Sequence, residues 1–334
     1  MVDTGIIHMT FGEVVRQYFQ RAVRNEHFGL IFILIALIAL ISVMTHGAFL
    51  NGTNIRSLLL RSSITGVAAV GQAFVMLSAG FDLSVGGVAV MTTCLGAAIM
   101  TESPRFLAHL PMVPGVLIML LVASGMGAIN GIFVSRLAMP SLIVTLATWQ
   151  IGKGAAFQIS KGGETIRYLP DSLAFFGKGD IGGLPMPVII FGLAVVLGYL
   201  VLQHTRFGRS IYAVGGSEGS AWLTGVNVMH IRFWVFVISG FCAGIASIIQ
   251  LSRVMCTNVM VLHGLELNSI AAVVIGGVSL FGGKGSIIGV LIGTFILMVL
   301  GNGMNLLGLS TYTQWIVKGV VIVAAVSIGA LRGR

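Results

Sequence analysis

Charged residues are scarce in this sequence. Asp, Glu, Lys and Arg make up only 9% of its 334 residues, whereas hydrophobic residues make up 56%. A soluble domain carries about 25% charged residues, so this chain lacks the polar surface that a water-soluble fold needs. The net charge of +9 does not indicate a nucleic-acid partner, because the basic residues are scattered between apolar runs, as membrane anchors are. The composition predicts an integral membrane protein.

The signatures of enzymes and metal sites are also missing. The three cysteines, Cys94, Cys242 and Cys256, have no metal-binding or redox spacing. No Gly-x-x-x-x-Gly-Lys-Ser/Thr loop is present, and the seven histidines form no His-Glu-x-x-His pair. We therefore expect no catalytic residues, no cofactor, no bound metal and no nucleotide-binding loop in this chain.

Long apolar runs fill most of the sequence instead. A membrane-spanning helix needs about 20 predominantly apolar residues, and the runs predict an all-α, polytopic transmembrane helix bundle of about ten spans. The predicted spans are 29–45, 61–79, 85–101, 113–135, 140–158, 186–203, 231–250, 266–282, 286–305 and 314–331. With ten spans, ten Lys and Arg residues lie on the side of the two termini and seven on the other. This bias favours cytoplasmic termini.

The chain divides into a short tail and one transmembrane domain. Residues 1–28 form an N-terminal tail in which apolar and basic residues alternate at helical spacing, from Phe11 to Arg24. This pattern predicts an amphipathic helix lying along the cytoplasmic membrane surface, although a short soluble helix packed on a partner protein would show the same pattern. Residues 29–334 form the transmembrane domain.

Few ionisable residues lie within the predicted spans, and such residues are usually functional. They are Lys153, Lys318 and Glu266, together with Asp82 between two spans. The other polar residues within the spans are neutral, which suits an uncharged, hydroxylated solute better than an ion. We select the following residues as candidates for the translocation path: Gln72, Asp82, Asn130, Asn268, Asn302 and Asn305. For each of them, hydrogen bonding between helices is an alternative role.

The loop over residues 204–230 is the most informative segment outside the spans. Ser217 is placed to cap a short helix that starts at Glu218, and Gly225 is placed to end it in a left-handed conformation. A short capped helix between two spans is a rigid knob that suits a partner's groove. An ordinary ordered loop is the alternative.

Several longer motifs, taken together and in order, resemble one known family. The sequence looks like the permease subunit of bacterial ABC sugar importers of the ribose, xylose and arabinose type, and the resemblance covers nearly the whole chain. The motifs that carry it are Gly80-Phe-Asp-Leu-Ser-Val-Gly86, Met139-Pro-Ser-Leu-Ile-Val-Thr-Leu146, Thr205-Arg-Phe-Gly-Arg-Ser-Ile-Tyr-Ala-Val-Gly-Gly216, Leu223-Thr-Gly-Val-Asn-Val228 and Glu266-Leu-Asn-Ser-Ile-Ala-Ala-Val-Val-Ile-Gly-Gly-Val-Ser-Leu-Phe-Gly-Gly283.

This resemblance implies a pore-forming subunit of the bacterial inner membrane that has no ATPase activity of its own. A cytoplasmic ATP-binding subunit would drive it, a periplasmic sugar-binding protein would deliver the sugar, and a second permease chain would complete the pore in the lipid bilayer. The loop near 204–230 would couple it to the ATPase, through Glu218, Ala221, Leu223 and Gly225. Within this loop the sequence departs from the family's usual residues at Gly219, Ser220 and Trp222.

Two other functions remain as alternatives. One is an ion-coupled secondary transporter of a small polar solute, which the shortage of intramembrane carboxylates disfavours. The other is a membrane-embedded enzyme, for which no catalytic constellation is present. Transport driven by an ion gradient without ATP would favour the first alternative.

Overall fold

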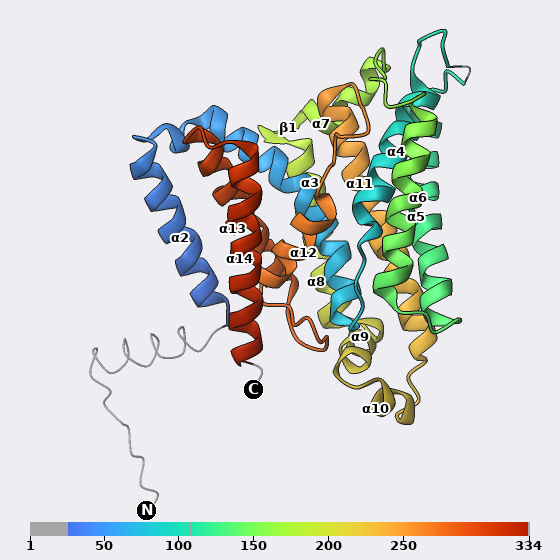
Figure 1. Cartoon of the computed structure of the whole chain (residues 1–334), viewed down its shortest axis with the longest axis vertical. Helices are drawn as coiled ribbons and strands as arrows, with labels where there is room; N and C mark the ends of the chain where they lie inside the picture. The colour runs from blue at the N-terminus through green and yellow to red at the C-terminus, as the bar shows by residue number, and fades with distance from the viewer. Residues whose placement is uncertain (1–25, 107, 333–334) are drawn as a thin grey trace, which may run out of the picture.

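The computed structural model describes residues 26–106 and 108–332, which form a helical bundle with almost no sheet (Figure 1). The amphipathic helix predicted within residues 1–28 lies outside the described residues, apart from 26–28, which begin the first described helix. Ten helices coincide with the ten predicted apolar runs. They are α2 (Glu26–Met44), α3 (Gly52–Leu77), α4 (Ser84–Met100), α5 (Met112–Ser135), α6 (Ser141–Ile159), α8 (Met186–His204), α11 (Val228–Val254), α12 (Leu265–Ile275), α13 (Ile287–Leu306) and α14 (Thr311–Arg332).

The all-α, multi-span architecture is therefore confirmed, but the number of ten spans is not. Six of the described helices are long and apolar enough to cross a membrane on length and composition alone: α2, α3, α5, α8, α11 and α13. The helix α12 has 11 residues, which extend over roughly 16 Å. The hydrocarbon core of a bilayer is about 30 Å thick, so α12 alone does not cross it.

The predicted span 266–282 is the one that the structure corrects. Its helix ends at Ile275, and the chain from 276 to 286 is not helical. Gly277, Gly282 and Gly283 have φ of +86°, +84° and +71°, a region that glycine enters without steric cost but that no right-handed helix contains. Figure 1 shows α12 in the middle of the bundle, with extended segments leading from it toward both ends.

Close contacts between glycines hold the centre of the bundle together. On α5 and α11, a Cβ at Gly127 would overlap the Phe236 carbonyl, and one at Gly240 would lie 3.0 Å from the Gly127 Cα. On α4 and α6, a Cβ at Gly152 would lie 2.6 Å from the carbonyl oxygen of Gly87. Small residues at four-residue spacing let helix backbones approach in this way.

The two ends of the bundle differ in structure. One end carries α9 (Arg206–Gly216) and α10 (Glu218–Leu223), near the end of α14 (Figure 1). The opposite end carries a compact loop between α6 and α8, built from η2 (Asp171–Ala174), α7 (Phe175–Lys178) and the antiparallel pair β1 (Asp180–Ile181) and β2 (Leu184–Pro185). The remaining short element is η1 (Ala48–Leu50), between α2 and α3.

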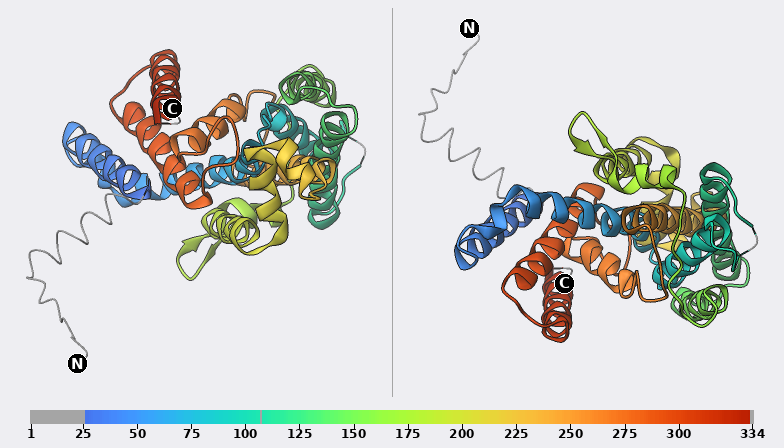
Figure 2. Two further views of the ribbon diagram at one scale, coloured as in Figure 1. Left: turned by 90° about the horizontal axis from the view of Figure 1, so that it is seen from below. Right: turned by 90° about the horizontal axis from the view of Figure 1, so that it is seen from above.

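The helices α6, α12 and α14 lie along one side of the molecule. Both views in Figure 2 place α12 between the other two on this side, with α2 at the far edge of the bundle. The helix α4 packs on α6 and also contacts α12. This side therefore brings together helices that are distant in the sequence.

Candidate functional site

The knob predicted between α8 and α11 is present as the short helix α10. The Ser217 side chain accepts a hydrogen bond from the backbone N–H of Ser220 at 3.3 Å, which caps the helix at its start. The helix ends at Leu223, and Gly225 follows with φ of +82°. The cap at Ser217 and the left-handed conformation at Gly225 are thus confirmed.

Three of the four residues predicted to couple the chain to an ATPase, Glu218, Ala221 and Leu223, lie on α10, and Gly225 follows it. Ala221 faces inward and is 3% exposed, whereas Leu223 is 78% exposed and neighbouring Trp222 is 70% exposed. The carboxylate of Glu218 pairs with the Arg232 guanidinium of α11 at 2.6 Å. Exposed large apolar side chains next to one another mark a contact surface.

A groove of about 350 Å³ lies beside this surface. It opens between α10, the end of α5 and the start of α11. Its lining residues are Ser135, Ala138, Glu218, Gly219, Trp222, Val228, Met229 and Arg232. The sequence predicted the knob, but not this groove, because its walls come from three separate segments.

Behind the knob, three backbone segments meet without intervening side chains; we call this meeting point the glycine junction. It comprises Gly215 and Gly216 at the end of α9, Leu77 to Ala79 after α3, and Gly282 and Gly283 before α13. The backbone N–H of Gly283 donates to the Leu77 carbonyl at 3.0 Å. A Cβ at Gly215 would overlap that carbonyl and lie 2.6 Å from the Gly283 nitrogen.

A tyrosine of α9 also forms a hydrogen bond at this junction. The hydroxyl of Tyr212 donates to the carbonyl of Gly285 at 2.9 Å. Burial raises the pKa of the Tyr212 hydroxyl above its ordinary value, so it remains a protonated donor at neutral pH. The junction joins the knob to the segment that leads from α3 to α4 and to the segment that leads from α12 to α13.

Three of the predicted path residues lie together in a buried polar network, which we call the Asp82 network. Asp82 is 1% exposed, and its carboxylate accepts from the Ser84 backbone at 2.9 Å and from the Ser239 hydroxyl at 2.7 Å. The Asn130 amide donates to Ser84 Oγ at 2.9 Å. Each of these groups comes from a different part of the bundle, so the network ties α4, α5 and α11 to the segment before α4.

The network continues on both sides of Asp82. The Thr148 hydroxyl of α6 donates to Asn130 Oδ1 at 2.6 Å. The Gln72 amide of α3, oriented so that donors meet acceptors, bonds the backbone oxygen and nitrogen of Asp82 at 2.9 and 3.3 Å. The side chains of Gln72, Asp82 and Asn130 therefore have partners within the protein. This arrangement is typical of a fold-organising network.

The other three predicted path residues lie elsewhere. Asn302 of α13 and Asn54 of α3 exchange two side-chain hydrogen bonds, at 3.0 and 2.9 Å. The side chain of Asn268 contacts the Lys318 ammonium at 3.5 Å, and Asn305 is exposed near the end of α13. The six candidates thus do not form one continuous path within a single chain.

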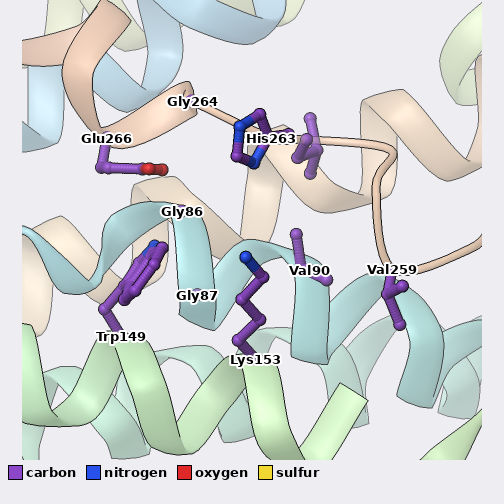
Figure 3. Close-up of a pocket in the computed structure, with 10 residues that line it drawn as sticks. Gly86, Gly87, Val90, Trp149, Lys153, Val259, His263, Gly264 and Glu266 are labelled. Carbon is purple, nitrogen blue, oxygen red and sulfur yellow. The ribbon is translucent and has the colours of Figure 1, made fainter. Parts of the chain in front are cut away.

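A second polar cluster, which contains none of the predicted path residues, lies between α4, α6 and α12. Figure 3 shows Trp149 and Lys153 of α6 and Glu266 of α12 pointing into one pocket across Gly86 and Gly87 of α4. Two of its residues could be singled out from the sequence, since Lys153 and Glu266 are among the rare ionisable residues of the spans. Among the described residues, no group of three His, Cys, Asp or Glu side chains is placed to hold a metal ion.

Comparison with known proteins adds three related sequences and one family. The family of the branched-chain amino acid transport system permease component matches residues 54–326. The ribose import permease protein RbsC of Escherichia coli is 37% identical over 94% of this chain and 96% of its own length. The D-allose transport system permease protein AlsC of E. coli is 36% identical, over 92% of each chain.

A third relative comes from a different bacterium. The L-arabinose ABC transporter permease protein AraH of Azospirillum brasilense is 34% identical over 89% of this chain and 86% of its own length. No solved structure matches the chain. The sequence similarity extends over the knob, the glycine junction and the Asp82 network, since all three lie within residues 54–326.

Proposed function

This chain belongs to the permease-component family of branched-chain amino acid transport systems, and we propose that it carries a neutral monosaccharide. It is a transmembrane subunit of an ABC importer in the bacterial inner membrane, and a separate subunit hydrolyses ATP. An ATPase and a substrate-binding protein are its general partners. The relatives named for ribose, D-allose and L-arabinose support a monosaccharide as the cargo.

The proposed topology has ten crossings and cytoplasmic termini. Residues 1–28 would be the interfacial tail and 29–334 the permease domain. The segment around α12 would make the eighth crossing as a short helix with extended ends. Irregular backbone at membrane depth is tolerated where protein or a water-filled path covers it. Single cysteines at positions 3 and 333, in a cysteine-free chain, should resist an impermeant thiol reagent applied outside intact cells; labelling of either would refute this topology.

The proposed partners follow from the two ends of the bundle. The ATPase subunit would dock on α10 and the groove beside it, with Trp222 and Leu223 as its apolar contacts. The periplasmic binding protein would dock at the opposite end, over the loop between α6 and α8. A second permease chain, identical or different, would face the side formed by α6, α12 and α14 and complete the pore.

The glycine junction is the observation that supports a coupling role for the knob. A push on α10 reaches α9 directly, because only Ser217 separates the two helices. From α9 it reaches the segments before α4 and before α13 through backbone-to-backbone contacts. Backbone contacts transmit displacement better than long side chains, because they have no rotamers to absorb it.

Two substitutions in the knob test this coupling. Gly225→Val should distort the end of α10, since a β-branched residue is strained at φ of +82°. Glu218→Arg should break the pair with Arg232 and place a positive charge at the helix start, which the helix dipole disfavours. In both variants, reconstituted with their partners, sugar uptake should fall roughly tenfold or more. The stimulation of ATPase activity by loaded binding protein should fall by a similar factor.

Gly192→Val is the matched control, since Gly192 lies on the open surface of α8 with no atom within 4 Å of an added Cβ. The control should keep uptake and ATPase stimulation close to those of the unchanged chain. Normal expression and co-purification of the ATPase are checked first. Full stimulated ATPase activity and uptake in both knob variants would show that α10 does not couple the two subunits.

A further inference from the structure

Six polar and aromatic side chains lie along the side of the molecule formed by α6, α12 and α14, and we call them the polar wall. They come from three helices that are far apart in the sequence and lie side by side in both views of Figure 2. They are Trp149 and Lys153 of α6, Glu266 and Asn268 of α12, and Trp315 and Lys318 of α14.

One half of the wall is built around Glu266. Its carboxylate hydrogen-bonds the Trp149 side chain and lies near Lys153. The Lys153 ammonium lies 5.0 Å from the centre of the Trp149 ring, a cation–π contact. A Cβ at Gly86 would overlap the Glu266 carboxylate, so this glycine lets Glu266 approach α4.

The other half joins α12 to α14. The Lys318 ammonium lies 3.5 Å from Asn268 Oδ1. Trp315, one turn away from Lys318, is 53% exposed, and its ring centre lies 5.9 Å from that of His263. Asn268 lies two residues after Glu266 on α12, so the two halves meet on this short helix.

Both lysines lie at the same depth inside the bundle. Lys153 is six residues before the end of α6, roughly 9 Å, and Lys318 is seven residues after the start of α14, roughly 10 Å. Both helix ends are at the end of the bundle opposite α10. Lys153 lies over Trp149, one turn deeper, so its ammonium does not reach outward toward the membrane surface.

Lipid cannot cover such a wall. Placing Lys or Glu side chains at this depth against hydrocarbon is costly, so intramembrane charges face a protein partner or a hydrated path. Yet Lys153 and Lys318 are only half-buried within this chain. The polar wall therefore faces water or a second protein chain.

We propose that the polar wall is the first sugar-binding surface of the translocation path, on the outer half of the membrane. This inference rests on the proposed function. Lys153 and Lys318 would donate hydrogen bonds to sugar hydroxyls, and the exposed ring of Trp315 would pack on the apolar face of the sugar. Glu266 is only 8% exposed, so it would act as the anion that holds Lys153 and Trp149 in place behind the sugar. The recess among Trp149, Lys153 and Glu266 has about 10 Å³ of room, enough for one water molecule, so the sugar lies against the wall.

Thiol labelling tests where the sugar binds. Asn268→Cys, in a chain from which Cys94, Cys242 and Cys256 have been removed, should react with a membrane-impermeant methanethiosulfonate reagent in the assembled importer. Loaded binding protein, with D-ribose, D-allose and L-arabinose as the sugars tested, should slow this reaction about tenfold relative to unloaded binding protein. Asn51→Cys, at an exposed position between α2 and α3, is the control; it should react with the reagent at the same rate whether the binding protein is loaded or unloaded.

Sugar uptake per ATP hydrolysed gives a second measurement. Glu266→Gln and Lys318→Met should each lower this ratio about tenfold. Lys318→Met removes a charged donor to the sugar, and Glu266→Gln removes the negative charge that holds Lys153 in place. Glu102→Gln and Lys178→Met make the same chemical changes on exposed side chains outside the spans and should leave the ratio unchanged. If a wall variant fails to assemble, the labelling experiment still tests the proposal, because Asn268→Cys leaves the other five wall residues unchanged.

The outcomes separate this inference from the proposed function. If the unchanged chain shows no ATP-dependent uptake of any of the three sugars, the proposed function fails. If it does transport sugar, but position 268 is not protected and the wall variants keep the ratio of their controls, the polar wall is not a sugar-binding surface.

Discussion

The Asp82 network and the polar wall contain similar residues but differ in how they are enclosed. In the Asp82 network the carboxylate is 1% exposed and accepts hydrogen bonds from serines within the protein. In the polar wall, Lys153 and Lys318 are half-buried on an open side of the bundle. A polar group whose partners all lie in the protein stabilises the fold, whereas one that remains open at membrane depth needs a ligand, water or a partner chain.

Removing the Asp82 carboxylate is expected to have the largest effect. Asp82→Ala leaves the Ser84 and Ser239 donors unpaired in the interior, which should destabilise the fold by roughly 3 kcal/mol or more. The amount of folded protein in mild detergent and its thermal midpoint should both fall, and transport should fall in proportion. The exposed carboxylate of Asp171 offers the control, Asp171→Ala. If the amount of folded protein is unchanged while transport disappears, Asp82 acts in the translocation path, and the distinction between the Asp82 network and the polar wall is wrong.

Substitutions of two adjacent glycines of α4 are expected to affect different properties, one the stability of the fold and the other transport. A Cβ at Gly87 would lie 2.7 Å from the Trp149 Cα, against the backbone of α6, whereas one at Gly86 would meet mainly the flexible end of Glu266. Gly87→Ala should therefore lower the stability by about 1–3 kcal/mol. Gly86→Ala should fold normally but displace Glu266 and reduce uptake several-fold. Equal thermal midpoints and equal uptake for the two variants would contradict this assignment.

The smallest effect is expected at Asn302. Asn302→Ala removes the paired hydrogen bonds with Asn54, which should cost about 1 kcal/mol of stability. Asn305→Ala, at an exposed position on the same helix, should leave the thermal midpoint unchanged. A large loss of transport in Asn302→Ala at normal stability would show that Asn302 acts in transport, as the polar wall is proposed to, and would contradict this assignment.

The sequence predicted the helices of the bundle well, because each apolar run is long and its ends are marked by glycine, proline or charge. It failed at α12, since the run 266–282 stays apolar beyond Ile275, where the positive φ of Gly277 ends the helix. The positive φ values of Gly282 and Gly283 keep the following segment from being helical. It also missed α9 as a separate helix, which ends in two glycines, Gly215 and Gly216, that would weaken a helix elsewhere.

The sequence could predict which residues were unusual, but not which of them meet. Lys153, Glu266 and Lys318 stood out as ionisable residues in apolar spans, yet they are separated by 113 and 52 positions in the chain. Gln72, Asp82 and Asn130 were grouped with Asn268 because all are polar residues of spans. Only the packing of the helices places the first three in a closed network and Asn268 on an open side.

Reconstitution into proteoliposomes tests the central claim most directly. The chain is assembled with and without its ATPase subunit and sugar-loaded binding protein, and uptake of radiolabelled D-ribose, D-allose or L-arabinose is measured with ATP supplied on the ATPase side. Uptake of at least one sugar should require both partners and ATP, and should persist when ionophores collapse the proton and sodium gradients. Uptake by the chain alone, driven by an imposed ion gradient and indifferent to ATP, would contradict the account and indicate a secondary transporter.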